Sequence, residues 1–142
     1  SPENTNNVTD ERAKGFEKAF LNKRLSMDKN LWCILGLDII LSGKAPGNIK
    51  EFFEERPEIT AVFTVNSELA EYTYSVLIQM HEQIEKHIEL VSFDQPNIQN
   101  FSYLEQNEEE ICNTTVQLLL SQIEGHHYNP QRIVVPVKLV HK

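Results

Sequence analysis

Cysteine is scarce in this sequence, and its spacing excludes two common kinds of site. Cys33 and Cys112 are the only two cysteines, and they lie far apart with no Cys-x-x-Cys spacing, so neither a disulfide framework nor a cysteine zinc site is expected. Both have apolar neighbours, which predicts two reduced thiols in the core. The adjacent His126 and His127 have no further ligand pattern around them, so no metal site is predicted. Motifs for phosphate loops and nucleophilic triads are also missing, so no enzyme is predicted.

Basic residues and long apolar runs are few as well. Lys and Arg number 13 against 21 Asp and Glu, which gives a formal net charge of −8 with no basic cluster. An acidic surface repels phosphate backbones, so this chain by itself is not expected to bind nucleic acid. No apolar run is long enough to span a membrane, and no signal peptide is visible, which favours a cytoplasmic location. The start, Ser-Pro-Glu-Asn, is typical of a fragment of a longer protein.

What the sequence does contain is a regular alternation of strand and helix signals. Residues 1–9 are polar and are expected to form a disordered or linker tail, followed by one domain over residues 10–142. Strands are predicted at 31–35, 59–65, 88–93, 101–104 and 133–140, the last at a sheet edge because of Pro136. Helices are predicted from Asp10 to about Lys23, before Pro57, after Asn66, and from Asn107 to Gly125. This order indicates a three-layer α/β/α sandwich with a mostly parallel sheet.

The most informative stretch contains two strands that flank an amphipathic helix. Residues 59–65 are almost continuously apolar, which is typical of a strand covered on both faces. Asn66 is predicted to cap the helix that follows, and Asp94 comes directly after the second strand. Ligands bind at the carboxyl ends of the strands in open parallel sheets, so Asn66 and Asp94 are expected to project toward one crevice.

The order of these residues resembles the effector-binding domain of the LacI/GalR family of bacterial transcription regulators. The segments that carry the resemblance are Arg12 to Phe16, Thr60 to Ala70, Phe93-Asp94, Gln106 and Pro136 to Val140. They match the family's Arg-x-x-Gly-Phe, Thr-Ala-(apolar)-Phe-x-x-Asn, Phe-Asp, Gln and Pro-x-x-Leu-Val patterns in the right order. The resemblance covers the chain from Asp10 onward, and it departs from the family at Ser67, where Asp is usual.

The resemblance implies that this chain is the second lobe of a two-lobed, periplasmic-binding-protein-like domain. Such a domain holds a small molecule between its lobes, often a sugar, and controls a DNA-binding head of the LacI or the GntR type that lies outside this chain. It also implies a homodimer and no cofactor, with Tyr74 and Ile78 at the dimer contact because they lie off the core stripe of their helix. The alternative is a lobe of an extracytoplasmic sugar-binding protein of a transporter, which shares the fold.

Four residues make up the predicted ligand site, and each has a second interpretation. Asp94 is expected to accept hydrogen bonds from ligand hydroxyls; the alternative is an aspartate that only ends a strand. Arg12 is expected to bind two ligand hydroxyls, or a ligand carboxylate, with its planar guanidinium. The alternative is a solvated side chain near a helix N-terminus. Asn66 contacts the ligand or serves only as a helix cap. Gln106 contacts the ligand or serves the hinge between the lobes.

Overall fold

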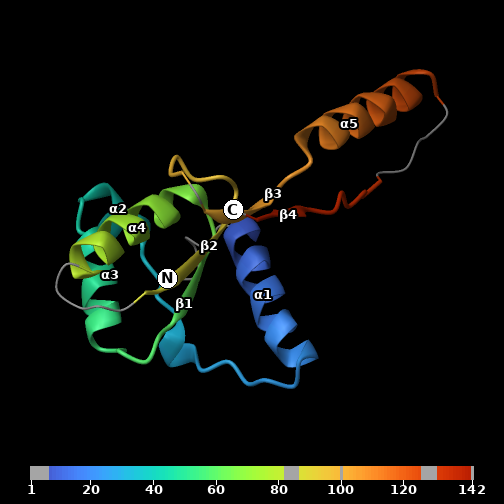
Figure 1. The fold of residues 1–142 in the computed structure, drawn as a ribbon. Helices are drawn as coiled ribbons and strands as arrows, with labels where there is room; N and C mark the ends of the chain where they lie inside the picture. Colours follow the sequence, from blue (N-terminus) through green and yellow to red (C-terminus); the bar gives the residue numbers. More distant parts are fainter. Residues whose placement is uncertain (1–6, 82–86, 100, 126–130, 142) are drawn as a thin grey trace.

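The computed structural model describes residues 7–81, 87–99, 101–125 and 131–141, which form a four-stranded mixed sheet with helices on both faces (Figure 1). β1 (Ala61–Thr64), β2 (Glu89–Phe93) and β3 (Ser102–Glu105) are parallel to one another, and β4 (Lys138–Val140) is antiparallel to β3. The strand order is β1-β2-β3-β4, so β4 lies at an edge, as Pro136 predicted. The α/β class expected from the sequence is confirmed.

The helices form a layer on each side of the sheet, apart from one that projects away from it. α1 (Asn7–Asn22) lies on one face, and α3 (Ala45–Glu54) and α4 (Ser67–His81) lie on the other (Figure 1). Two short elements, η2 (Lys29–Leu31) and α2 (Leu37–Leu41), connect α1 to α3. α5 (Glu108–Ile123) extends outward between β3 and β4 (Figure 1). No helix in the described ranges is long and apolar enough to cross a membrane.

The buried core lies between α3, α4 and the side of the sheet that faces them. Ile49 and Phe53 of α3 pack with Val76 and Met80 of α4, and none of these side chains is more than 8% exposed. Each pair is four residues apart, which places its members on one face of a helix. These four residues therefore mark the inward faces of α3 and α4.

α1 covers the opposite face of the sheet less completely. Phe16 stacks on Phe63 of β1 with ring centroids 4.8 Å apart and an interplanar angle of 9°, and Phe20 packs beside Phe16. Phe63 remains half-buried, whereas its neighbour Thr64, on the α4 side, is buried. β1 is thus covered on both faces, as its apolar sequence predicted, with the tighter packing on the α4 side.

Several predicted details differ from the structure. Residues 31–35 form no strand, because no described strand lies beside them to accept their backbone hydrogen bonds. α1 begins at Asn7 and not at Asp10, so residues 7–9 are helical, while residues 1–6 lie outside the described part of the chain. The closing strand spans only three residues of the predicted 133–140.

The two cysteines also differ from their predicted setting. Cys33 and Cys112 are free, as expected, but both residues are exposed and neither belongs to the core. Cys112 lies on α5, which buries none of its residues. Cys33 lies in the unpaired segment after η2. Although the residue is exposed as a whole, partial burial of its thiol raises the pKa of that group, and the cation of Arg56 partly offsets the rise.

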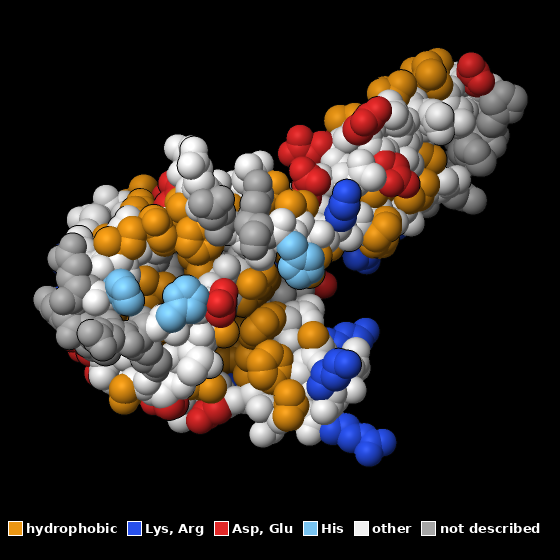
Figure 2. All heavy atoms as spheres, in the orientation of Figure 1, with side chains coloured by type: hydrophobic (Ala, Val, Ile, Leu, Met, Phe, Trp, Pro, Cys, Tyr) orange, Lys and Arg blue, Asp and Glu red, His pale blue; other side chains and the backbone are white. Residues whose placement is uncertain are grey.

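α5 presents an apolar face that nothing in the described structure covers. Asn107 caps the helix by accepting the Glu110 N–H at 3.1 Å, and Gly125, at φ 78°, follows its end, as predicted. Val116 and Ile123 are 55% and 72% exposed, and Figure 2 shows hydrophobic side chains along the projecting helix. Because helices gain most of their stability from packing, α5 adds little to the stability of this lobe.

Phe53→Ala should lower the free energy of unfolding by about 3–5 kcal/mol, because it removes a ring from the packed core. Ile123→Ala on α5 should change this free energy by less than about 0.5 kcal/mol, since that residue is 72% exposed. Urea denaturation followed by circular dichroism measures both values. Equal losses of unfolding free energy for the two variants would show that α5 belongs to the core.

Candidate functional site

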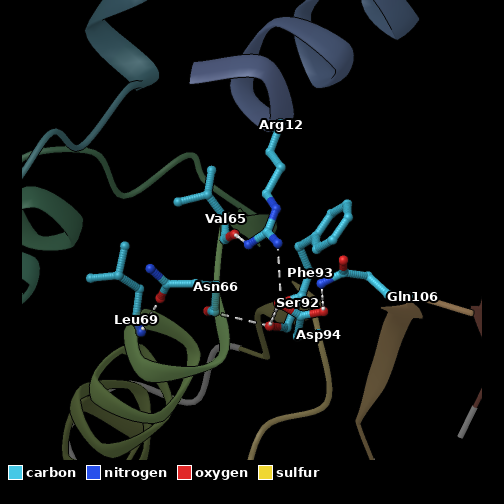
Figure 3. Close-up of polar contacts among 8 residues, drawn as sticks. All are labelled: Arg12, Val65, Asn66, Leu69, Ser92, Phe93, Asp94 and Gln106. Atoms are coloured by element: carbon cyan, nitrogen blue, oxygen red, sulfur yellow. Dashed lines mark hydrogen bonds and ion pairs between the residues drawn. The ribbon is translucent and has the colours of Figure 1, made fainter. Parts of the chain in front are cut away.

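Three of the four predicted site residues converge where β1 and β2 end and α1 begins (Figure 3). Nη2 of Arg12 lies 3.3 Å from Oδ2 of Asp94. Nε2 of Gln106, which follows β3, donates a 2.8 Å hydrogen bond to Oδ1 of Asp94. The structure thus brings Arg12, Asp94 and Gln106 together, with the carboxylate at the centre of the group.

The side chain of Arg12 is held in place by contacts with other parts of the fold. Its Nη1 donates a 2.9 Å hydrogen bond to the carbonyl oxygen of Val65, and its guanidinium carbon lies 3.9 Å from the ring centroid of Phe93. The side chain is only 15% exposed. A guanidinium has five N–H donors in a planar fork and stacks well on aromatic rings, so one side chain can make all these contacts. The alternative of a solvated arginine is therefore wrong.

Asp94 has an unusual backbone conformation that directs its carboxylate. Its φ is 67°, and its N–H donates a 2.9 Å hydrogen bond to the carbonyl of Leu104. Positive φ is uncommon outside glycine, but Asp and Asn tolerate it better than other residues. The carboxylate is 34% exposed, and a carboxylate offers about four lone-pair positions. Capacity for further hydrogen bonds therefore remains beyond those to Arg12 and Gln106.

Asn66 lies beside this group, but its side chain points elsewhere. Its Oδ1 accepts a 2.8 Å hydrogen bond from the N–H of Leu69, which confirms its predicted role as the cap of α4. Figure 3 shows the amide on the α4 side, away from Asp94. The structure therefore separates Asn66 from the other three predicted residues.

Ser92 is a residue of this region that sequence reasoning missed. Its hydroxyl, in a side chain only 1% exposed, lies 3.4 Å from the carbonyl oxygen of Asn66 and thereby links the ends of β1 and β2. The signal in the sequence was a small polar residue inside the apolar run of 88–93. A serine of this size lets the two strands and the first turn of α4 pack closely together.

The chemistry of the group is hydrogen bonding by a cation, a carboxylate and an amide. Acceptors and donors lie side by side, which suits a ligand whose hydroxyl groups both donate and accept. Within the described ranges, no group of three or more His, Cys, Asp or Glu side chains is placed to hold a metal ion. His126 and His127 lie outside those ranges.

Comparison with known proteins gives the family. Residues 1–142 match the family described as periplasmic binding protein-like domain. The chain belongs to this family. The HTH-type transcriptional regulator MalR, from two strains of Streptococcus pneumoniae, is 27% identical over 140 residues, which cover 95% of this chain and 41% of that protein.

A solved structure shows the same fold. The structure described as transcriptional regulator CelR-cellobiose complex matches with a TM-score of 0.74 at 19% sequence identity, over 92% of this chain and 40% of that one. The chain thus spans about two fifths of the length of both regulators. Together with the family match, these findings confirm the resemblance to the effector-binding domain of LacI/GalR regulators.

Arg12→Ala should lower the free energy of unfolding by about 2–3 kcal/mol, because it leaves the Val65 carbonyl and the Asp94 carboxylate without a strong donor. Arg12→Lys keeps the charge but not the planar fork, so it should recover only part of that loss. Lys14→Ala is a matched control on the same helix, since Lys14 only pairs with Glu11 at an exposed position. Urea titration that gave Arg12→Ala no larger a loss than Lys14→Ala would contradict the assignment.

Proposed function

We propose that this chain is one lobe of the ligand-sensing domain of a cytoplasmic bacterial transcription regulator. In the longer protein, the first lobe would close over the carboxyl ends of β1 and β2 and enclose a small molecule, for which we propose a sugar. Closure would change the geometry of a DNA-binding head outside this chain. The relatives named as regulators support this function over that of a transporter's sugar-binding protein.

The observation that carries the proposal is the Asp94 carboxylate, held in place and still partly exposed. Arg12 and Gln106 fix both of its oxygen atoms before any ligand arrives. A preorganised acceptor loses little conformational freedom when a ligand binds, which favours affinity. A sugar with adjacent hydroxyls supplies two donors to one carboxylate, and such charge-assisted bonds are strong. Gln106 and Arg12 offer donors to the same ligand.

The exposed apolar face of α5 supports the presence of another lobe in the longer protein. Leu119 and Leu120 are 55% and 50% exposed, and Ile133 and Val134, on the segment that returns to β4, are also exposed. Exposed apolar surface of this kind is typical of an interface. We infer that α5 packs within the first lobe, which lies outside this chain, and that β3 and β4 carry the chain out to it and back (Figure 1).

Asp94→Asn in the longer protein should abolish the response to its ligand and leave the fold intact. A thermal-shift screen against a sugar panel identifies the ligand first, because binding to the native state raises the melting temperature. Asn is the better substitution than Ala, since Asn tolerates the positive φ while removing the charge. Glu105→Gln, the same change at an exposed neighbouring carboxylate, is the control and should keep the shift.

Two results would count against this site. One is an unchanged ligand-induced shift in Asp94→Asn. The other is micromolar sugar binding to the present chain alone in calorimetry, because a half-open site leaves the ligand solvated and should bind it only weakly.

We further propose that the sensing domain is a homodimer with a contact at the C-terminal half of α4. Tyr74 packs edge-on against Phe101, with ring centroids 4.9 Å apart, and Ile78 nearby is 45% exposed. The two side chains lie with Leu77 and Ile88 along a groove in this surface. An apolar, aromatic-lined groove of this kind is typical of the centre of a protein–protein interface.

Ile78→Glu should weaken self-association of the longer protein at least about tenfold, because it places a charge in an apolar contact. Leu21→Glu introduces the same charge at an exposed position of α1 and should leave the dimer unchanged. Sedimentation equilibrium at micromolar concentration measures both. Equal dissociation constants for the wild type and Ile78→Glu would remove this surface from the interface.

A further inference from the structure

The backbone around Asp94 is held at two points outside its own side chain. The φ of 67° at Asp94 is a left-handed conformation that most side chains disfavour, so surrounding contacts have to maintain it. The first point is the 2.9 Å hydrogen bond from the Asp94 N–H to the Leu104 carbonyl, which ties the residue to β3. The second point follows three residues later, at Asn97.

A side chain of α4 supplies that second point. The backbone N–H of Asn97 donates a 2.9 Å hydrogen bond to Oε1 of Glu71. Hydrogen bonds to a charged acceptor are stronger than those between neutral groups. On the same face of α4, Tyr74 packs edge-on against Phe101, with ring centroids 4.9 Å apart. The loop that leads from β2 to β3 therefore lies beside α4 (Figure 1).

The two residues between Asp94 and Asn97 leave the backbone little freedom. Pro96 is buried, and its ring fixes its φ at about −65°. Gln95 precedes a proline, which restricts it to extended conformations. Because both residues are stiff, a displacement of the Asn97 N–H would be passed along the backbone to Asp94.

We propose that Glu71 is a positioning residue for the ligand site. By fixing the Asn97 N–H it holds the turn that follows β2. It thereby keeps Asp94 at positive φ, with its carboxylate oriented toward Arg12 and Gln106. This role rests on the function proposed for Asp94, and it extends the site to a side chain of α4. The alternative is a surface hydrogen bond that contributes only to stability.

Glu71→Ala in the longer protein should weaken binding of the sugar selected by the thermal-shift screen by about three- to tenfold, the effect of one lost hydrogen bond. Glu71→Gln keeps an acceptor oxygen at the same position and should recover most of the affinity. Glu68→Ala is the matched control, because Glu68 lies one turn earlier on α4 and accepts its 3.3 Å hydrogen bond from Tyr72 of the same helix. It should leave the affinity unchanged. Calorimetry measures the dissociation constant of each variant.

Hydrogen exchange in the ligand-free longer protein gives a second readout, which reports on the turn and not on overall stability. In Glu71→Ala the amides of Asn97 and Asp94 should exchange at least about tenfold faster than in the wild type. The amide of Leu90, a buried residue within β2, should keep its wild-type rate.

An affinity loss in Glu71→Ala no larger than that in Glu68→Ala would overturn the proposal, and so would an unchanged exchange rate at Asp94. The outcome for Asp94→Asn separates this role from the proposed function. If Asp94→Asn left sugar binding unaltered, the ligand site would be wrong and the role of Glu71 with it. If Asp94→Asn abolished binding and Glu71→Ala did not change it, only the positioning role would fail.

Discussion

The guanidinium of Arg12 is the contact on which the rest of the site depends. It binds the carbonyl that follows β1, the carboxylate that follows β2, and the ring of Phe93, the last residue of β2. Because β1 and β2 are parallel, their carboxyl ends meet at the same edge, where a single planar cation from α1 can reach both. The same side chain therefore docks α1 on the sheet and fixes Asp94.

In the proposed function, this arrangement links stability to ligand recognition. The carboxylate of Asp94 is oriented by a cation, by an amide and by its own positive φ, so its position is set before a ligand binds. In the proposed function the ligand adds hydrogen bonds to a rigid acceptor, and the first lobe, outside this chain, contributes the remaining contacts. Such a site contributes to specificity through geometry, while closure of the lobes removes water from it.

Features set by local sequence were predicted well. The Asn66 and Asn107 caps and the inward faces of α3 and α4 follow from side-chain chemistry and spacing within one element. The convergence of Arg12 on Asp94 was expected only through the family resemblance, since nothing local connects two residues so far apart. The positive φ of Asp94 and the role of Ser92 were missed, because each depends on how neighbouring strand ends pack.

The strand predicted at 31–35 is wrong, and the reason lies in strand pairing. Its composition suits a strand, but a strand exists only where another pairs with it, and no described strand does so. The buried setting predicted for Cys112 failed for a related reason, because the apolar face of α5 finds no partner within the described structure. In both cases the sequence pattern is that of a buried element, and no described residue covers it.

A crystal structure of the longer protein with the sugar that most raises its melting temperature tests the central claim most directly. We expect ligand hydroxyls within hydrogen-bonding distance of the Asp94 carboxylate. Arg12 should still bind the Val65 carbonyl, and the ligand should be enclosed between the two lobes. A ligand bound elsewhere, without contact to Arg12, Asp94 or Gln106, would contradict it.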